Sequence, residues 1–517
     1  MPEYLTPGVY IEEIERGPRP IEGVPTSTAA FIGETERGPV LPLLVTSYND
    51  YRRWFGNVFG DLPRYMPYAV SGFFDNGGKR LYVSRVVGKN AETAMLEAAP
   101  FSLRALGPGE WGNRIWVKTQ PGSTRDAGGT SIGFRLRLAY WSTLPDPTYD
   151  PFSEEEDARK ARPRPTLVED FDDLSYDPAS SDYFGKRLPG NSVLVALTVA
   201  EGTPANTPMD DIPGTFLADG DDGDAPLEAD FKGEADEGRQ VQGLEILKQD
   251  AYRDVALVHA PYPREDPVLI GKRVVEHCEA NKFRFAVVDC DPHQANVSEL
   301  VPRSKVTDSQ YGAFYYPWLY VSDPRTGARK LVPPGGHTLG IYARTDTERG
   351  VFKAPANEIV RGAIDLEYAI DDERQGTLNP AGVNVTRNFP GRGIRVWGAR
   401  TLSSNGLWKY VSVRRLFIFL ERSIYEGTQW VVFEPNDDRL WARVKDTIRL
   451  FLRTQWRDGA LFGRTEDEAF FITCDRTTMT QDDILNGRLK CQIGIAPVRP
   501  AEFVIFQIFQ NTAESQR

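Results

Sequence analysis

The sequence predicts a multi-domain α/β protein that carries a β-rich insertion. A chain of 517 residues is longer than one hydrophobic core supports, so three or four domains of about 100–200 residues are expected. Short apolar strands, such as 29–33 and 285–289, alternate with helical patterns, as in a sheet buried on both faces. Alternating strands such as 134–138 predominate instead between residues 108 and 240.

Residues 1–25 predict an extended N-terminal arm, because prolines at positions 2, 7, 18, 20 and 25 exclude a helix. A short strand is expected at 9–14, and a lone strand must pair with the edge of a sheet. The pattern alone leaves open whether that sheet belongs to the same chain or to a neighbour. The strand contains Val9, Tyr10, Ile11, Glu12 and Glu13.

Residues 26–107 and 241–375 predict one central α/β domain. Strands are expected at 29–33, 81–87, 254–258 and 285–289, and helices at 67–75, at 241–249 and around 274–278. The sequence at 76–79 resembles a phosphate-binding loop, but Gly77 is followed by Gly78 and not by lysine. A tight turn between helix and strand is therefore expected there.

Residues 108–240 predict a β-rich, acidic insertion. Its segment 201–238 holds twelve Asp or Glu residues against one lysine and is rich in glycine and proline, which indicates a long mobile surface segment. The acidic run 219–224 suggests calcium as an alternative, but the twelfth position from Asp219 is Asp230 where an EF-hand loop needs glutamate.

Residues 376–500 predict a C-terminal assembly domain organised around the run 391–402. From 387 to 517 the chain has 20 Lys or Arg and 15 Asp or Glu, a net of +5 within a total of −12, so residues 1–386 sum to −17. This segregation suggests a basic pole that faces a partner and an acidic body. A helix is expected at 411–425 and a short strand at 430–433.

A long helix is expected at 436–458, capped by acidic residues at its start and ended by Gly459. Its predicted core side chains are Leu440, Val444, Ile448, Phe451 and Leu452. Arg449, Arg453 and Arg457 fall together on another side, either as a solvated face or as a contact with an acidic partner.

Two further segments complete this region. A short helix or turn at 482–488, with Asp482, Asp483 and Arg488, precedes a strand at 489–495 that includes Lys490. The arm 501–517 holds a strand that is apolar on both faces, so it should be covered and paired. Its residues are Phe503, Val504, Ile505, Phe506, Ile508 and Phe509.

Composition excludes several classes of protein. The chain has no apolar run of about 18 residues and no export signal, so we expect folding in a cytoplasm without insertion into a membrane. A pI near 5.2 argues against nucleic acid. No cofactor or metal is expected. Widely spaced cysteines are expected to be reduced, buried and inert, and these are Cys278, Cys290, Cys474 and Cys491.

Two alternatives remain at this point. The first is an α/β hydrolase or protease that uses Asp289, His293 and a serine such as Ser304, since Asp289, Cys290 and Asp291 follow a strand end. No nucleophile-elbow motif accompanies these residues. The second alternative is a module in residues 123–238 that binds carbohydrate or another surface.

Several motifs together resemble contractile tail sheath proteins of phages and of contractile injection systems. They cover residues 1 to about 120 and 240–517, and leave the insertion outside. The motifs are Pro7-Gly8-Val9-Tyr10-Ile11-Glu12-Glu13, Tyr315-Tyr316-Pro317-Trp318, Val332-Pro333-Pro334-Gly335-Gly336-His337, Gly340-Ile341-Tyr342-Ala343-Arg344-Thr345-Asp346, Gly350-Val351-Phe352-Lys353-Ala354-Pro355-Ala356-Asn357 and Val396-Trp397-Gly398-Ala399-Arg400-Thr401-Leu402.

The resemblance implies a structural protein that is not an enzyme. Copies would polymerise helically, alone or with paralogues, around an inner tube protein, and the array would shorten to drive the tube through a target envelope. Both arms would add strands to sheets of neighbouring subunits, and the central domain would be subtilisin-like in fold. Baseplate and terminal cap proteins would be further partners, and the insertion would face outward.

The resemblance also implies that a helix of the C-terminal domain contacts the tube. Both the helix at 436–458 and the segment 482–492 remain candidates for it. The particle would assemble in a bacterial cytoplasm, with release from the cell possible afterwards.

Overall fold

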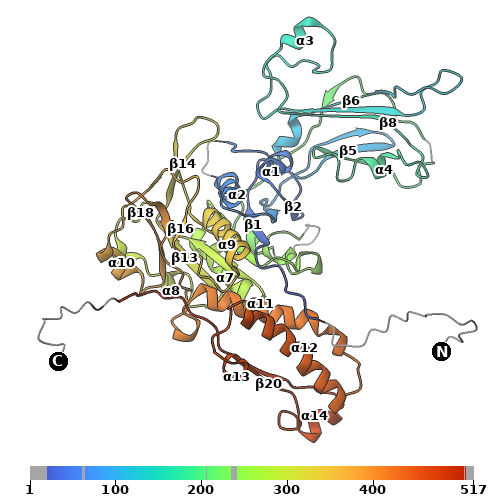
Figure 1. Ribbon diagram of the computed structural model, residues 1–517. Helices are drawn as coiled ribbons and strands as arrows, with labels where there is room; N and C mark the ends of the chain where they lie inside the picture. The colour runs from blue at the N-terminus through green and yellow to red at the C-terminus, as the bar shows by residue number, and fades with distance from the viewer. Residues whose placement is uncertain (1–19, 61–63, 205–206, 234–240, 506, 508–517) are drawn as a thin grey trace, which may run out of the picture. The chain divides into compact units, whose positions relative to one another are not determined.

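The computed structural model describes residues 20–60, 64–204, 207–233, 241–505 and 507 (Figure 1). The chain divides into two compact units, residues 25–415 and residues 1–24 with 416–517. The division falls inside helix α11 (Val411–Gly427). Among the described residues, none of the helices is both long and apolar enough to cross a membrane.

A nine-stranded sheet forms the core of the first unit. The strands from β18 to β3 run parallel, whereas β2, β19 and β16 are antiparallel to their neighbours. Every residue of β1 and β13 is buried, as expected for strands covered on both faces. In spatial order the strands are β16 (Glu358–Ile359), β19 (Gly393–Val396), β18 (Val383–Phe389), β13 (Gly312–Tyr316), β12 (Phe285–Asp289), β11 (Leu257–His259), β1 (Ala29–Gly33), β3 (Leu81–Arg85) and β2 (Leu43–Val45).

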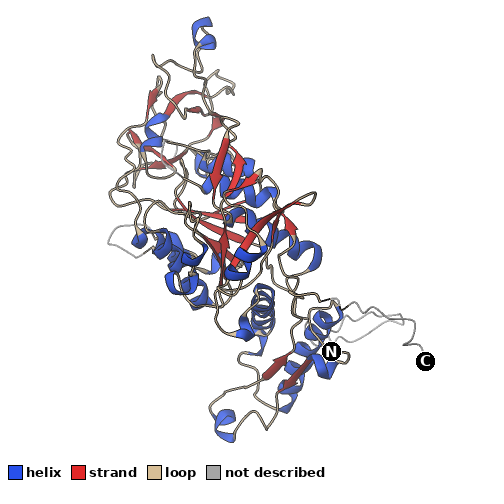
Figure 2. Ribbon diagram, turned by 90° about the vertical axis from the view of Figure 1, so that its left-hand side faces the viewer, coloured by secondary structure: helices blue, strands red, loops and turns tan. Residues whose placement is uncertain are grey.

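Helices cover this sheet (Figure 2). Helix α7 (Pro267–Asn281) packs on β11 and β12, and α2 (Met66–Asp75) packs against α9 (Gly335–Arg349). Glycines allow α2 and α9 to approach closely, because a Cβ at Gly336 would lie 2.4 Å from the Ala69 oxygen, and one at Gly340 would lie 2.4 Å from the Phe73 oxygen. The shorter helices of this unit include α1 (Tyr48–Phe55) and α10 (Asp372–Leu378).

Most predicted elements of the central region are confirmed, with local differences. The strand expected at 254–258 is the shorter β11. The helix expected at 241–249 is only α6 (Gly243–Ile246), whose first residue, Gly243, has a φ of +62°. The turn at 76–79 joins α2 to β3, with Gly77 at a φ of +111°. The predicted α/β class is correct.

The insertion contains two antiparallel sheets, one of β10, β6, β7 and β8 and one of β4, β5 and β9. Its β-rich part begins before residue 108, because β4 and β5 pair with β9 and share its core. The strands are β4 (Met95–Ala98), β5 (Phe101–Ala105), β6 (Ile115–Pro121), β7 (Phe134–Tyr140), β8 (Leu167–Leu174), β9 (Val195–Val199) and β10 (Thr215–Phe216).

The prediction of a long mobile segment at 201–238 is wrong for much of its described part. Met209, Ile212 and Leu217 are buried in the core of the insertion, and helix α5 (Glu228–Lys232) follows. The acidic composition of the segment does not show that these few apolar side chains are buried. Residues 205–206 and 234–240 lie outside the described residues.

The predicted boundary at residue 376 is also wrong. Strands β18 and β19 belong to the nine-stranded sheet of the first unit, so the run 391–402 does not organise a separate C-terminal domain. Val383 and Val385 are buried in β18, which pairs in parallel with β13. The apolar pattern of this strand completes the central sheet.

The second unit combines long helices with a two-stranded sheet. The strand predicted at 430–433 is absent, since η5 (Gln429–Val431) is a 3-10 helix and Phe433 has a φ of +70°. After α11 its elements are α12 (Asp438–Arg457), α13 (Glu466–Ala469), β20 (Phe470–Thr473), α14 (Gln481–Leu485) and β21 (Gln492–Ile495).

Candidate assembly surface

Helix α12 is the longest of the helices that the structure describes in the second unit. It begins at the predicted cap, where the Asp437 carboxylate accepts a hydrogen bond from the Leu440 backbone at 2.9 Å, and Gly459 follows it with a φ of +85°. The apolar stripe is confirmed as a buried face. Its members are Leu440, Val444, Ile448, Phe451 and Leu452, together with Trp441.

The arginines on the other side of α12 are not equivalent. Arg449 and Arg453 both form ion pairs with Glu466 of α13, and the Arg453 Nε lies 2.7 Å from Glu466 Oε2. Hydrogen bonds from Arg453 and Arg449 lower the pKa of Glu466. Arg457 is exposed and has no ion-pair partner among the described residues. Of these three arginines, Arg457 is therefore the one whose charge no described acidic side chain neutralises.

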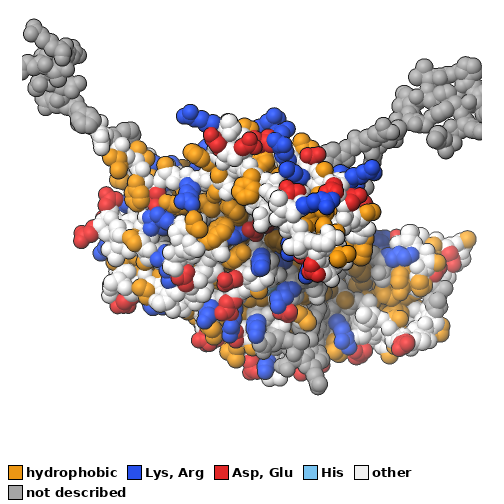
Figure 3. Space-filling view, turned by 90° about the horizontal axis from the view of Figure 1, so that it is seen from below, with side chains coloured by type: hydrophobic (Ala, Val, Ile, Leu, Met, Phe, Trp, Pro, Cys, Tyr) orange, Lys and Arg blue, Asp and Glu red, His pale blue; other side chains and the backbone are white. Residues whose placement is uncertain are grey.

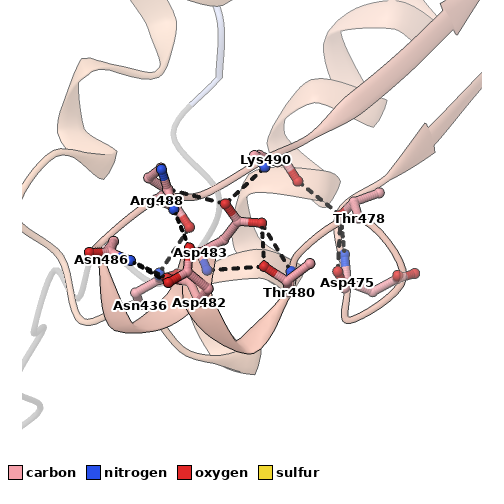
Figure 4. A network of polar contacts seen from close by, with 9 residues as sticks. All are labelled: Asn436, Asp475, Thr478, Thr480, Asp482, Asp483, Asn486, Arg488 and Lys490. Atoms are coloured by element: carbon pink, nitrogen blue, oxygen red, sulfur yellow. Dashed lines mark hydrogen bonds and ion pairs between the residues drawn. The ribbon is translucent and has the colours of Figure 1, made fainter.

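The loop that carries α14 contains the second group of predicted contact residues (Figure 4). Thr480 and Asp483 form a reciprocal capping box at the start of α14, with the Thr480 hydroxyl accepting from the Asp483 backbone at 3.2 Å. Asp483 also receives Lys490 Nζ at 2.8 Å and Arg488 Nε at 3.1 Å. Lys490 and the Thr480 bonds hold the pKa of Asp483 well below its usual range.

Asp483 therefore does not fit its predicted role in tube contact. Its carboxylate is 4% exposed and ties α14 to the start of β21, which is an internal structural role. Asp482, Arg488 and Lys490 remain at the surface, with side chains 74%, 52% and 55% exposed. The Arg488 Nη2 lies 2.6 Å from Asp482 Oδ2.

Exposed apolar side chains accompany these charges. Leu485, at the end of α14, is 77% exposed, and Phe471 in β20 is 59% exposed. From below, the molecule shows hydrophobic side chains among both acidic and basic ones (Figure 3). Neither residue is among the contact residues predicted from the sequence, although period-two alternation in β20 requires Phe471 to face away from the buried Phe470 and Ile472.

Strands β20 and β21 form a small antiparallel sheet. They pair antiparallel from Phe470 with Ile495 to Thr473 with Gln492, and no third strand joins them among the described residues. A two-stranded sheet leaves backbone donors and acceptors open along both outer edges.

Most of the predicted arm residues lie outside the described residues. This holds for Val9, Tyr10, Ile11, Glu12 and Glu13, and for Phe506, Ile508 and Phe509. Phe503, Val504 and Ile505 are described, are 71%, 68% and 83% exposed, and form no strand within this chain.

The residues of the hydrolase alternative do not come together. Asp289 lies 3.4 Å from His259 and accepts a hydrogen bond from the Gly335 backbone, whereas His293 pairs with Glu367 at 2.8 Å. The Ser304 hydroxyl donates to the Val301 carbonyl. Burial raises the pKa of Cys290 well above its usual range. These side chains form no catalytic triad.

Carboxylates of the acidic run 219–224 accept hydrogen bonds from other groups of the protein. Asp222 accepts from the Glu110 backbone at 2.9 Å, and Asp224 accepts from the Asn90 side chain at 3.0 Å. Within the described ranges, no group of three or more His, Cys, Asp or Glu side chains could hold a metal ion. The calcium alternative therefore has no support in this part of the chain.

Two known protein families match most of the second half of the chain. The family described as phage tail sheath protein central domain matches residues 243–402, and the family described as phage tail sheath C-terminal domain matches residues 403–511. The boundary between them follows β19 and precedes α11, in agreement with the observed position of β18 and β19 in the central sheet.

Individual proteins agree with these matches. A putative prophage major tail sheath protein of Pseudomonas aeruginosa (strain UCBPP-PA14) is 27% identical over 198 residues, 37% of this chain and 49% of the relative. The tail sheath protein of Salmonella phage ViI is 25% identical over 199 residues, 38% of this chain and 30% of the relative. The matched part thus spans half or less of these relatives.

Solved structures share the fold over nearly the whole chain. The sheath complex of PVC, an extracellular contractile injection system in the contracted state, has a TM-score of 0.59 at 23% identity and covers 100% of both chains. The contracted helical sheath of the anti-feeding prophage has a TM-score of 0.58 at 24% identity, covering 98% of this chain and 100% of the other.

The sequence families and the shared fold agree on one assignment. The chain belongs to the phage tail sheath family.

Proposed function

We propose that this protein is the subunit of a contractile sheath, in a phage tail or in an extracellular contractile injection particle. Copies polymerise helically around an inner tube and contract to drive it through a target envelope. The family matches over residues 243–511 are the observation that carries this proposal. Membership in this structural family confirms the prediction of a protein that is not an enzyme.

The open sheet of β20 and β21 supports strand exchange between subunits. The exposed apolar residues Phe503, Val504 and Ile505 have no partner strand in their own chain among the described residues. Such a segment gains both hydrogen bonds and burial when it joins the edge of another copy's sheet. The arm strand at 9–14 is the proposed second donor. A head-to-tail interface of this kind builds an open helical tube.

Contact with the tube is proposed for the outer surface of α12 and α14. Arg457 supplies a positive charge that no described residue pairs with, and Leu485 supplies an apolar anchor, whereas Arg488 and Lys490 are exposed but pair with Asp482 and Asp483. Arg449 and Arg453 contribute less, because Glu466 already neutralises them in part.

Rigid domains would rotate between two packings while the linking strands keep neighbours attached, and a metastable extended lattice would store the free energy. The insertion would face outward, the central domain would be subtilisin-like in fold only, and baseplate and cap proteins would join the ends. Assembly would take place in a bacterial cytoplasm.

Deletion of residues 1–16 tests the proposal. The variant should remain a folded monomer that forms no sheath by electron microscopy, since one strand donor is lost. A matched control carries Val9→Thr and Ile11→Thr, which keep the backbone donors and acceptors of the arm and should retain partial assembly. Normal sheaths from the deleted chain would refute the arm mechanism, and a full-length chain that never forms tubes would refute the sheath function itself.

A further inference from the structure

Two cysteines of the second unit lie opposite each other on paired strands. The register of β20 and β21 joins Ile472 with Ile493 and Thr473 with Gln492. The next pair along the same register is Cys474 with Cys491. The two cysteines are separated along the chain by the loop of residues 475–490.

The pair occupies a non-hydrogen-bonded position of the ladder. The Ala496 backbone donates to the Ala469 carbonyl at 2.9 Å, so the pairs that exchange backbone hydrogen bonds fall at alternate positions that include Thr473 with Gln492. Cα atoms of a non-hydrogen-bonded pair lie about 4.5 Å apart. This separation is within the range of about 4.4–6.8 Å that a disulfide spans.

The strands are also held together on the far side of the cysteines. The Asp475 backbone donates to the Thr478 hydroxyl at 3.3 Å, and that hydroxyl donates to the Lys490 carbonyl at 2.9 Å (Figure 4). Thr478 thus relays the ladder bond that Asp475 and Lys490 would otherwise form directly. Cys474 and Cys491 are therefore fixed from both sides.

The two thiols already interact. A hydrogen bond with Cys491 lowers the pKa of the Cys474 thiol, with a smaller effect from the Lys445 ammonium. The same hydrogen bond raises the pKa of Cys491. Cys474 is 4% exposed and Cys491 is half-buried, so a small reagent reaches the pair through Cys491.

We propose that Cys474 and Cys491 form a reversible disulfide that closes the base of the 475–490 loop. The oxidant is a small-molecule disulfide. Its exchange with Cys491 gives a mixed disulfide and releases one small thiol. The Cys474 thiolate then attacks the Cys491 sulfur, forms the protein disulfide and releases the second small thiol, so two protein thiols are oxidised as one disulfide is reduced.

The cross-link would constrain the loop that carries α14, Asp483 and Leu485. A reducing cytoplasm keeps the site as thiols, whereas an oxidising environment outside the cell favours the bond. The other two cysteines, Cys278 and Cys290, are buried, and burial raises the pKa of both thiols. They serve as an internal reference that should not react.

The test uses the purified full-length chain equilibrated with a glutathione and glutathione disulfide buffer. Remaining thiols are blocked with iodoacetamide after denaturation, and peptides are mapped by mass spectrometry. We expect a cross-linked peptide joining Cys474 to Cys491, with Cys278 and Cys290 blocked. Recovery of all four blocked cysteines, or of glutathione held on Cys491 alone, would overturn the proposal.

A control variant tests whether the position of the two thiols in the β20–β21 ladder determines how readily they cross-link. The variant carries Cys474→Ser and Cys491→Ser with Thr473→Cys and Gln492→Cys, which moves the thiols to the adjacent hydrogen-bonded pair. It should cross-link less at equilibrium, because the side chains of a hydrogen-bonded pair lie farther apart, even though its Cα separation of about 5.5 Å is itself within the range that a disulfide spans. Equal cross-linking would contradict the assigned position.

Hydrogen exchange provides the readout on the loop. Amides of residues 475–490 should exchange several-fold more slowly in the oxidised chain and recover on addition of dithiothreitol, with no change in Cys491→Ser. Unchanged exchange on oxidation would refute the proposed constraint. All of these measurements use the unassembled chain, so their outcome does not depend on sheath formation.

Discussion

Arg415 and Asp346 form an ion pair that is buried from solvent, with side chains only 4% and 5% exposed. Arg415 lies near the start of α11 and Asp346 lies in α9, and their Nη2 and Oδ2 atoms are 2.5 Å apart. The Thr26 hydroxyl also donates to Asp346, and the Thr26 carbonyl accepts from Arg415. This cluster joins three distant parts of the first unit.

Substitution Arg415→Met should destabilise the first unit by about 3–5 kcal/mol, because it leaves the Asp346 carboxylate buried without its partner. Urea unfolding followed by tryptophan fluorescence measures the loss. The double substitution Arg415→Met with Asp346→Leu should recover part of it. The exposed pair of Arg476 and Asp438 is the control, and Arg476→Ala should leave the unfolding curve unchanged.

The buried pair of His259 and Asp289 predicts a pH dependence. The His259 Nδ1 contacts the Val287 carbonyl at 2.9 Å, so its proton lies there and Nε2 faces Asp289 Oδ2 as an acceptor. Burial raises the pKa of Asp289 to about 7 and lowers the pKa of His259 to about 4. Below about pH 7 the protonated, neutral form of Asp289 is therefore favoured opposite the neutral His259 ring.

The sign of the effect follows from the unfolded values, about 3.9 for Asp and 6.5 for His. The contribution of Asp289 is fully present below about pH 4 and is lost as pH rises through about 7. Asp289→Asn supplies a permanent amide donor, so it should gain stability relative to the original chain as pH rises from about 4 to about 7, by at most about 1.4 kcal/mol per pH unit, and the difference should level off above pH 7.

Thermal unfolding across this pH range checks the prediction. Glu373→Gln, on the exposed start of α10, is the control and should follow the original chain at every pH. A difference between Asp289→Asn and the original chain that does not change with pH would rule out the proposed protonation.

Charge reversal distinguishes the arginines of α12. Arg457→Glu should keep the unfolding temperature and weaken assembly on the tube by at least about tenfold, because the described residues give Arg457 no ion-pair partner to lose. Arg449→Glu should lower the unfolding temperature, since it places a second carboxylate against Glu466. Co-sedimentation with the tube protein and thermal unfolding separate the two effects. Unchanged binding by Arg457→Glu would shift the contact to α14.

Leu485 tests that second surface. Leu485→Ala should fold normally and weaken tube binding by about 1–2 kcal/mol, roughly tenfold, because an exposed anchor of this size is buried only in the complex. Leu407 is a matched control, also exposed but located in the first unit, and Leu407→Ala should bind normally. Equal effects of the two substitutions would argue against a specific role of α14.

Local patterns predicted much of the fold correctly. The strands at 29–33 and 285–289, the core stripe of α12 and its acidic cap all follow from apolar periodicity and capping chemistry. The strand predicted at 430–433 is wrong, since the 3-10 helix η5 ends at Val431 and is followed by the exposed side chains of Val432 and Phe433. Apolar character alone does not tell a strand from an exposed apolar turn.

The sequence by itself determined the α/β class, the family resemblance and the arginine stripe, because these depend on residue type and spacing. Only the tertiary structure decided which arginines of α12 form ion pairs, since Glu466 of α13 pairs with Arg449 and Arg453. It likewise decided that Asp483 of α14 pairs with Arg488 and Lys490. It also assigned β18 and β19 to the central sheet and set Cys474 opposite Cys491. Strand pairing and ion pairing join residues far apart in the chain, and no local pattern specifies such partners.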